Sequence, residues 1–198
     1  MSSRHLRPLA HAAVAGGACW IMLAVWAVLT ASANEKDNPN GALTDAGDYV
    51  GFTVFAAALA LTVLGLLALH LHQRGADGRL GRAGAAVAML GCAAQCVVIT
   101  GVIVNGEDTS WFGVAAPLAI LTWLLGSVAF GVAIRRAGVL PGWVGTALPL
   151  VTMVAIVGSE FGTSALIGVF LIVVGRRLAT ATGAGFRPVA DIGFRLPG

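Results

Sequence analysis

The stretch that decides the fold is Tyr49–Arg82, which reads YVGFTVFAAALALTVLGLLALHLHQ followed by RGADGRLGR. Its first 25 residues contain no Asp, Glu, Lys or Arg, whereas the nine that follow hold three arginines. A helix rises about 1.5 Å per residue, so about 20 apolar residues cross the roughly 30 Å hydrocarbon core of a bilayer. The stretch therefore predicts a membrane-spanning helix that ends in a short basic turn.

Long charge-free windows recur along the whole chain of 198 residues. The other windows are Pro8–Asn34, Ala83–Gly106, Thr109–Ile134, Ala137–Ser159 and Phe161–Gly175. Backbone amides in lipid must be satisfied within the segment, which predicts helices, and the strict alternation of a membrane β-barrel is missing. The chain is 58% hydrophobic and 11% charged, with a mean hydropathy of +0.88, whereas soluble domains average about 25% charged residues.

The connections between the windows alternate in charge. Eleven of the twelve lysines and arginines fall on one side of the predicted membrane, and seven of the nine acidic residues fall on the other. Basic loops stay in the cytoplasm, so we predict an all-α bundle of six transmembrane helices with the N-terminus and the C-terminus cytoplasmic. Within a transmembrane domain of residues 1–178 the predicted spans are 9–33, 49–72, 83–105, 111–134, 140–158 and 160–177, and residues 179–198 form a cytoplasmic tail.

The N-terminus allows a second interpretation. Arg4 and Arg7, an apolar run and then Ala31-Ser32-Ala33 also fit a signal peptide with an A-x-A cleavage site. The apolar run is longer than the roughly 7–15 residues of a typical signal peptide, which favours a retained span.

Two polar residues are the candidates for a ligand or ion site. Gln95 is an amide near the middle of the third span, where it either bonds to a neighbouring helix or contacts a substrate. Glu160 precedes a window of 15 residues, which is about 22 Å long as a helix. It is therefore either a capping residue in an outer turn or a carboxylate drawn into the membrane.

Small residues spaced four apart form a stripe on the third span. Its members are Gly84, Ala88, Cys92, Cys96 and Thr100. Such stripes let membrane helices approach closely, so we assign this one to helix packing rather than to thiol chemistry. No metal site is predicted, because His70 and His72 are two residues apart and point to nearly opposite faces of a helix.

The sequence contains no P-loop, HExxH, CxxC or GxSxG motif. We favour a non-catalytic, multi-pass protein of the bacterial plasma membrane without a cofactor, either an accessory or scaffold subunit or a binder of lipid-like ligands. Its partners would be the lipid bilayer and either further copies or a larger membrane complex. No nucleic acid is expected, because the net charge of +3 follows from the orientation of the loops.

One alternative is a small transporter or channel that uses Gln95, Pro149 and Glu160, and another is a membrane redox or haem protein that uses His11 and His70.

Two short motifs carry a resemblance. Residues 135–145 read RRAGVLPGWVG between the fourth and fifth spans, and Gly47-Asp48-Tyr49 opens the second span. Together with the six windows, they resemble small six-span integral membrane proteins of actinobacteria and related bacteria. The resemblance implies the six-helix fold and carries no activity.

Asp45 and Asp48 predict a cap for the second helix, since carboxylates stabilise helix N-termini.

Overall fold

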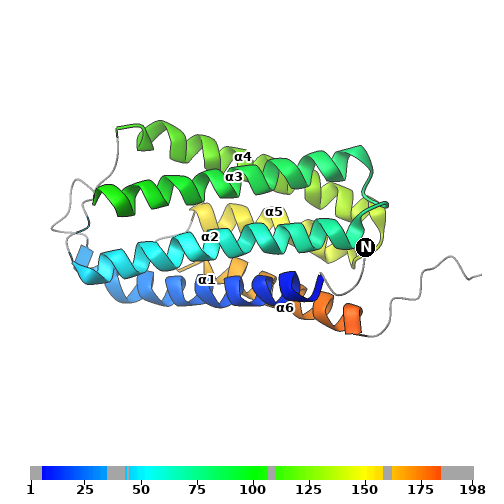
Figure 1. The fold of residues 1–198 in the computed structure, drawn as a ribbon, viewed down its shortest axis with the longest axis horizontal. Coiled ribbons are helices and arrows are strands. Elements are labelled where there is room, and N and C mark those ends of the chain that lie inside the picture. Colours follow the sequence, from blue (N-terminus) through cyan, green and yellow to red (C-terminus); the bar gives the residue numbers. More distant parts are fainter. Residues whose placement is uncertain (1–5, 35–42, 44, 107–109, 158–161, 184–198) are drawn as a thin grey trace, which may run out of the picture.

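Every regular element in the computed structural model is an α helix within the residues that it describes, which are 6–34, 43, 45–106, 110–157 and 162–183. The helices are α1 (Leu6–Asn34), α2 (Ala46–Gln73), α3 (Gly78–Asn105), α4 (Phe112–Ala137), α5 (Gly142–Val157) and α6 (Ala165–Gly183). They lie side by side and run roughly along the long axis of the molecule (Figure 1). The predicted all-α class is confirmed.

Four helices are long and apolar enough to cross a membrane: α1, α2, α3 and α4. The fifth, α5, is apolar but has only 16 residues, and α6 reaches Arg176 after eleven apolar residues. The outer surface is apolar as well, since Val104 is 78% exposed and Leu125 is 66% exposed. Helices that are apolar on all sides are suited to a lipid environment.

Two helices continue beyond the charge-free windows. The third, α3, begins at Gly78, five residues before the predicted start at 83, and so contains Arg79 and Arg82. The sixth, α6, ends at Gly183 and includes residues 179–183, which the sequence assigned to the tail. The backbone hydrogen bonds of a helix can continue past its last apolar residue. Long charged side chains near a helix end reach water while the backbone stays helical.

Two carboxylates fix the start of α2. Asp45 Oδ1 accepts a hydrogen bond from the backbone N–H of Asp48 at 2.9 Å, and Asp48 Oδ2 accepts one from the backbone N–H of Asp45 at 3.4 Å. This reciprocal pair is a capping box. The predicted capping of the second helix is confirmed.

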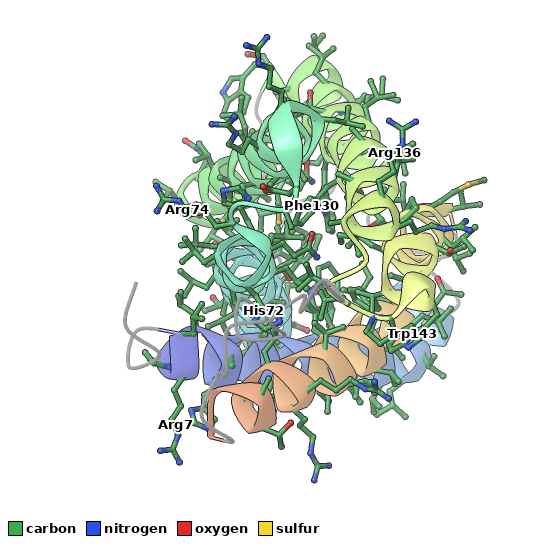
Figure 2. All side chains as sticks on the ribbon, turned by 90° about the vertical axis from the view of Figure 1, so that its right-hand side faces the viewer. Arg7, His72, Arg74, Phe130, Arg136 and Trp143 are labelled. Carbon is green, nitrogen blue, oxygen red and sulfur yellow. The ribbon has the colours of Figure 1, made fainter. Side chains whose placement is uncertain are left out.

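The charged side chains of the described residues divide between the two ends of the bundle. One end, the basic end, carries the arginines Arg7, Arg74, Arg79, Arg82, Arg135, Arg136, Arg176 and Arg177. Figure 2 looks onto this end, where the labelled arginines point outward. Asp45 and Asp48 lie at the other end of α2, the acidic end, and a helix of 28 residues separates the two ends by about 42 Å. Asp77 is the described acid at the basic end.

The helices form a closed ring. Each packs against the next in the chain, and α1 also packs against α6; the pairs α3–α4 and α1–α6 make the most extensive contacts. Large side chains such as Leu59, Leu66, Phe130 and Leu171 are buried inside the ring, and Phe130 lies near the middle of the bundle in Figure 2. The ring is therefore packed by apolar side chains.

A polar contact ties three helices together at mid-length. Trp20 Nε1 of α1 donates a hydrogen bond to Thr62 Oγ1 of α2 at 2.9 Å. The Trp20 ring also stacks on Trp123 of α4, with 6.4 Å between the ring centroids. Because an indole N–H in an apolar interior needs an acceptor, this bond fixes the orientation of Trp20.

Glycines set the spacing between α3 and α4. A Cβ on Gly91 would overlap the backbone nitrogen of Trp123, and a Cβ on Gly126 would overlap the backbone nitrogen of Ala88. The two helices can therefore approach until their backbones touch, which is how small residues stabilise helix pairs in membranes.

Candidate functional site

Gln95 is buried in α3, with 5% of its surface exposed. It lies one turn beyond Gly91, on the helix face that contacts α4. Its Oε1 atom has no hydrogen-bond partner among the described residues. The amide therefore lies at the α3–α4 contact, and its acceptor is unused there.

Glu160, the second predicted site residue, lies outside the described residues. Nearby, Thr163 Oγ1 donates a hydrogen bond to the backbone carbonyl of Val154 at 3.0 Å, and Ser164 is buried. The Thr163 hydroxyl therefore links the turn before α6 to the end of α5.

The stripe of small residues on α3 contacts two helices in turn. Gly84 and Ala88 lie against the backbone of α4. The thiols of Cys92 and Cys96 instead donate hydrogen bonds to the carbonyls of Leu59 and Ala56 on α2, each at 3.4 Å. Four residues turn a helix by about 400°, so each step moves the stripe about 40° round the helix. Thr100, the last member, is exposed and donates to the carbonyl of Cys96 at 2.8 Å.

The histidines of the haem alternative have different surroundings. His11 is exposed on α1. His70 Nδ1 lies 3.0 Å from Asp77 Oδ2, a contact that forms an ion pair when His70 is protonated and whose angles fall outside those of a hydrogen bond. Within the described ranges, no group of three or more His, Cys, Asp or Glu side chains is arranged to hold a metal ion.

Two buried polar residues, Gln73 and Asp77, lie close to His70 in the sequence at the basic end. Gln73 is 1% exposed, and neither polar atom of its amide has a hydrogen-bond partner in the part of the chain that the structure describes. Asp77 is also buried, and the rings of His70 and Phe130 of α4 meet edge to face with 6.4 Å between their centroids. Gln73 and Asp77 are not among the site residues predicted from the sequence. Two features of the sequence could have indicated them. Asp77 is an acidic residue within a basic turn, and Gln73 is an amide only three residues after His70.

An elongated groove lies between α2 and α3. It has a volume of about 590 Å³ and is lined by Ala60 and Val63 of α2, by the face of α3 from Ala93 to Asn105, and by Trp111. None of its lining residues is charged. Volumes of about 300–1,000 Å³ are typical of ligand sites. A smaller groove of about 310 Å³ lies between α1 and the start of α6.

One end of the α2–α3 groove, lined by Asn105 and Trp111, lies at the acidic end of the bundle. Trp111 sits against Gly101, where a Cβ would lie 3.2 Å from the indole ring. The backbone N–H of Leu43, just before α2, donates to the carbonyl of Gly106 at 2.8 Å, and Tyr49 Oη is close to Gly106. The end of α3 and the start of α2 therefore meet beside the groove.

Comparison with protein-family models, with curated proteins and with solved structures finds no match. The function must therefore be inferred from the arrangement of the residues themselves.

Proposed function

We propose that this chain is a six-span protein of a bacterial plasma membrane, with both ends in the cytoplasm. The division of charge supports this orientation, because all eight described arginines lie at one end of the bundle and basic ends remain cytoplasmic. The shorter α5 and α6 would then cross as a pair in a locally thinned bilayer.

Reporter fusions at Gly41 and Gly198 test the orientation. We expect an external signal from the fusion at Gly41 and a cytoplasmic signal from the fusion at Gly198. A fusion at Gly75, in the α2–α3 turn, serves as the internal control and should report the cytoplasm. An external signal from Gly198 would overturn the model, and so would a mature N-terminus at Asn34.

Within this topology, we propose that the protein binds a lipid-like ligand without catalysing a reaction. The observation that carries this proposal is the groove between α2 and α3, which is open to the surroundings, uncharged and of ligand size. The interior of the bundle, in contrast, is filled by buried apolar side chains. A ligand would therefore reach the groove from the membrane rather than through the bundle.

The transport alternative has weaker support. Its central residue, Gln95, lies where α3 and α4 are in close contact, and Pro149 packs beside Gly131 of α4. A water-filled path past Gln95 would require these helices to separate. For the redox alternative, a visible absorption spectrum of the purified protein is decisive, since haem absorbs visible light.

Ligand binding is tested by purifying the protein in a mild detergent and analysing the lipids that remain bound. We expect one lipid class to be enriched over its share of the source membrane, at about one molecule per chain. Equal retention of all classes in their membrane proportions would refute the binding function. A partner protein retained at fixed stoichiometry, with no enriched lipid, would support the scaffold interpretation instead.

A further inference from the structure

The α2–α3 groove runs parallel to the helices and faces the surroundings of the protein. Its α3 wall runs from Ala93 to Asn105, which is about 18 Å along a helix axis. Along this length the groove is open to the surroundings and has a volume of about 590 Å³.

The groove has ten lining residues, and six of them are alanine, valine or glycine. Its lining is uncharged and mostly small or aliphatic, so it offers little to a polar guest. One acyl chain lying parallel to the helices matches this uncharged lining.

The acidic end of the bundle indicates which headgroup such a lipid carries. Asp45 and Asp48 lie at the start of α2, and the bond from Leu43 to Gly106 holds this segment beside the end of α3. The described arginines all lie at the basic end, about 42 Å away. An ammonium group is therefore attracted to this end, whereas an anionic headgroup would meet no described cation there.

Aromatic residues add to this preference. Tyr49 and Trp111 are 40% and 44% exposed at the acidic end, and Trp111 also lines the groove. Aromatic faces attract ammonium groups, with tryptophan the strongest. Carboxylates and aromatic rings at one end of an uncharged groove are what a lipid with an ammonium headgroup requires.

We infer that the groove holds one acyl chain of an ammonium-bearing phospholipid, of the phosphatidylethanolamine class, with the headgroup at the acidic end. This inference rests on the proposed lipid-binding function and adds the site, the leaflet and the headgroup. The second chain of the lipid remains in the surrounding membrane.

Native mass spectrometry of the full chain tests the inference. The wild-type protein is equilibrated with equal amounts of phosphatidylethanolamine and phosphatidylglycerol in detergent, and the retained lipid is counted by class. We expect one retained phosphatidylethanolamine per chain. Ala93→Phe fills the groove and should reduce retention about tenfold, the change produced by a loss of 1.4 kcal/mol.

Two further variants separate the groove from the headgroup. Ala86→Phe places the same bulk on an exposed position of α3 outside the groove and should retain the lipid. Asp45→Asn combined with Asp48→Asn removes the charges while keeping capping side chains. This double variant should still bind a lipid but should lose its preference between the two classes.

A measurement on the wild-type protein avoids any dependence on variant folding. Cys96 lines the groove, so an apolar maleimide should modify it slowly when phosphatidylethanolamine is present and faster after delipidation. Peptide mapping distinguishes Cys96 from Cys19 and Cys92.

The outcomes distinguish this inference from the function on which it rests. Equal retention by Ala93→Phe and Ala86→Phe, with Cys96 unprotected, would overturn the groove assignment while leaving lipid binding intact. Preferred retention of phosphatidylglycerol would overturn the headgroup assignment. The absence of any retained lipid on the wild-type protein would overturn the proposed function as well.

Discussion

Replacing Gly91 by alanine should weaken the bundle although alanine is the better helix former. A Cβ at this position would lie 2.6 Å from the Trp123 Cα and 2.8 Å from the carbonyl oxygen of Ala119, whereas ordinary Cβ contacts are 3.4–4 Å long. These are backbone atoms of α4, so no side-chain rotation relieves the overlap. The helices must separate by at least the difference between 3.4 and 2.6 Å, which is about 0.8 Å.

The loss of stability follows from the close contact between the backbones of α3 and α4. A gap of about 0.5–1 Å removes about a quarter to a half of the dispersion energy of each atom pair that it separates. Overpacking of this kind costs about 1–3 kcal/mol. Alanine recovers about 0.8–1.0 kcal/mol through its helix propensity, so the net loss for Gly91→Ala should be about 0–2 kcal/mol relative to the wild-type protein. Relative to a glycine-to-alanine change that causes no overlap, the loss should be about 1–3 kcal/mol.

Gly113→Ala is the matched control, because no atom lies within 4 Å of a Cβ at that position of α4. It should leave stability unchanged or raise it slightly. The assay is the free energy of unfolding in mixed micelles, obtained from titration with a denaturing detergent and followed by far-ultraviolet circular dichroism. Equal stability of the two variants would refute the close contact of α3 with α4.

Other contacts yield predictions of the same kind. Thr62→Val removes the acceptor of the Trp20 indole and should cost about 0.6–1.7 kcal/mol of unfolding free energy in the micelle assay; Thr53→Val, exposed on the same helix, should change little. Asp77→Asn weakens the buried contact with His70 and should cost about 1–3 kcal/mol by the same measurement, whereas Asp45→Asn keeps a good N-cap and should be nearly neutral. Arg177 lies 5.7 Å from the centre of the Trp143 ring, and Arg177→Gln should cost about 0.5–1 kcal/mol in the wild-type protein and nothing when Trp143 is already leucine. A cost that persists without the tryptophan would exclude the cation–π contact.

The helices could be predicted from the sequence because charge-free length is a strong signal in membrane proteins. The boundaries were less accurate where basic residues extend a helix. Arg79 and Arg82 were placed in a turn, yet they belong to the first turns of α3. A window defined by the absence of charge marks the apolar part of a helix and says nothing about where its hydrogen bonds stop.

The candidate sites were harder to predict. The groove arises where Ala60 and Ala93 leave space between two helices, and no feature of a single segment signals such a space. The stripe on α3 could be identified by its spacing, but the change of partner at Cys92 depends on where α2 and α4 lie. The sequence indicated Gln73 only weakly, because what distinguishes this amide is its complete burial in the folded bundle.

The pairing of α1 with α6 determines the order in which this protein can be completed. The ribosome makes α1 first, yet one of its two main partners is the last helix to be synthesised. The consecutive pairs α1–α2 and α3–α4 can associate as soon as each emerges, since neighbours in sequence have little loop entropy to lose. Until α6 arrives, the side of α1 around Gly17 faces lipid or another protein, and the backbone of Gly168 later occupies that position. We therefore expect chains truncated before residue 165 to expose this α1 surface, and to be the forms that chaperones and membrane proteases recognise.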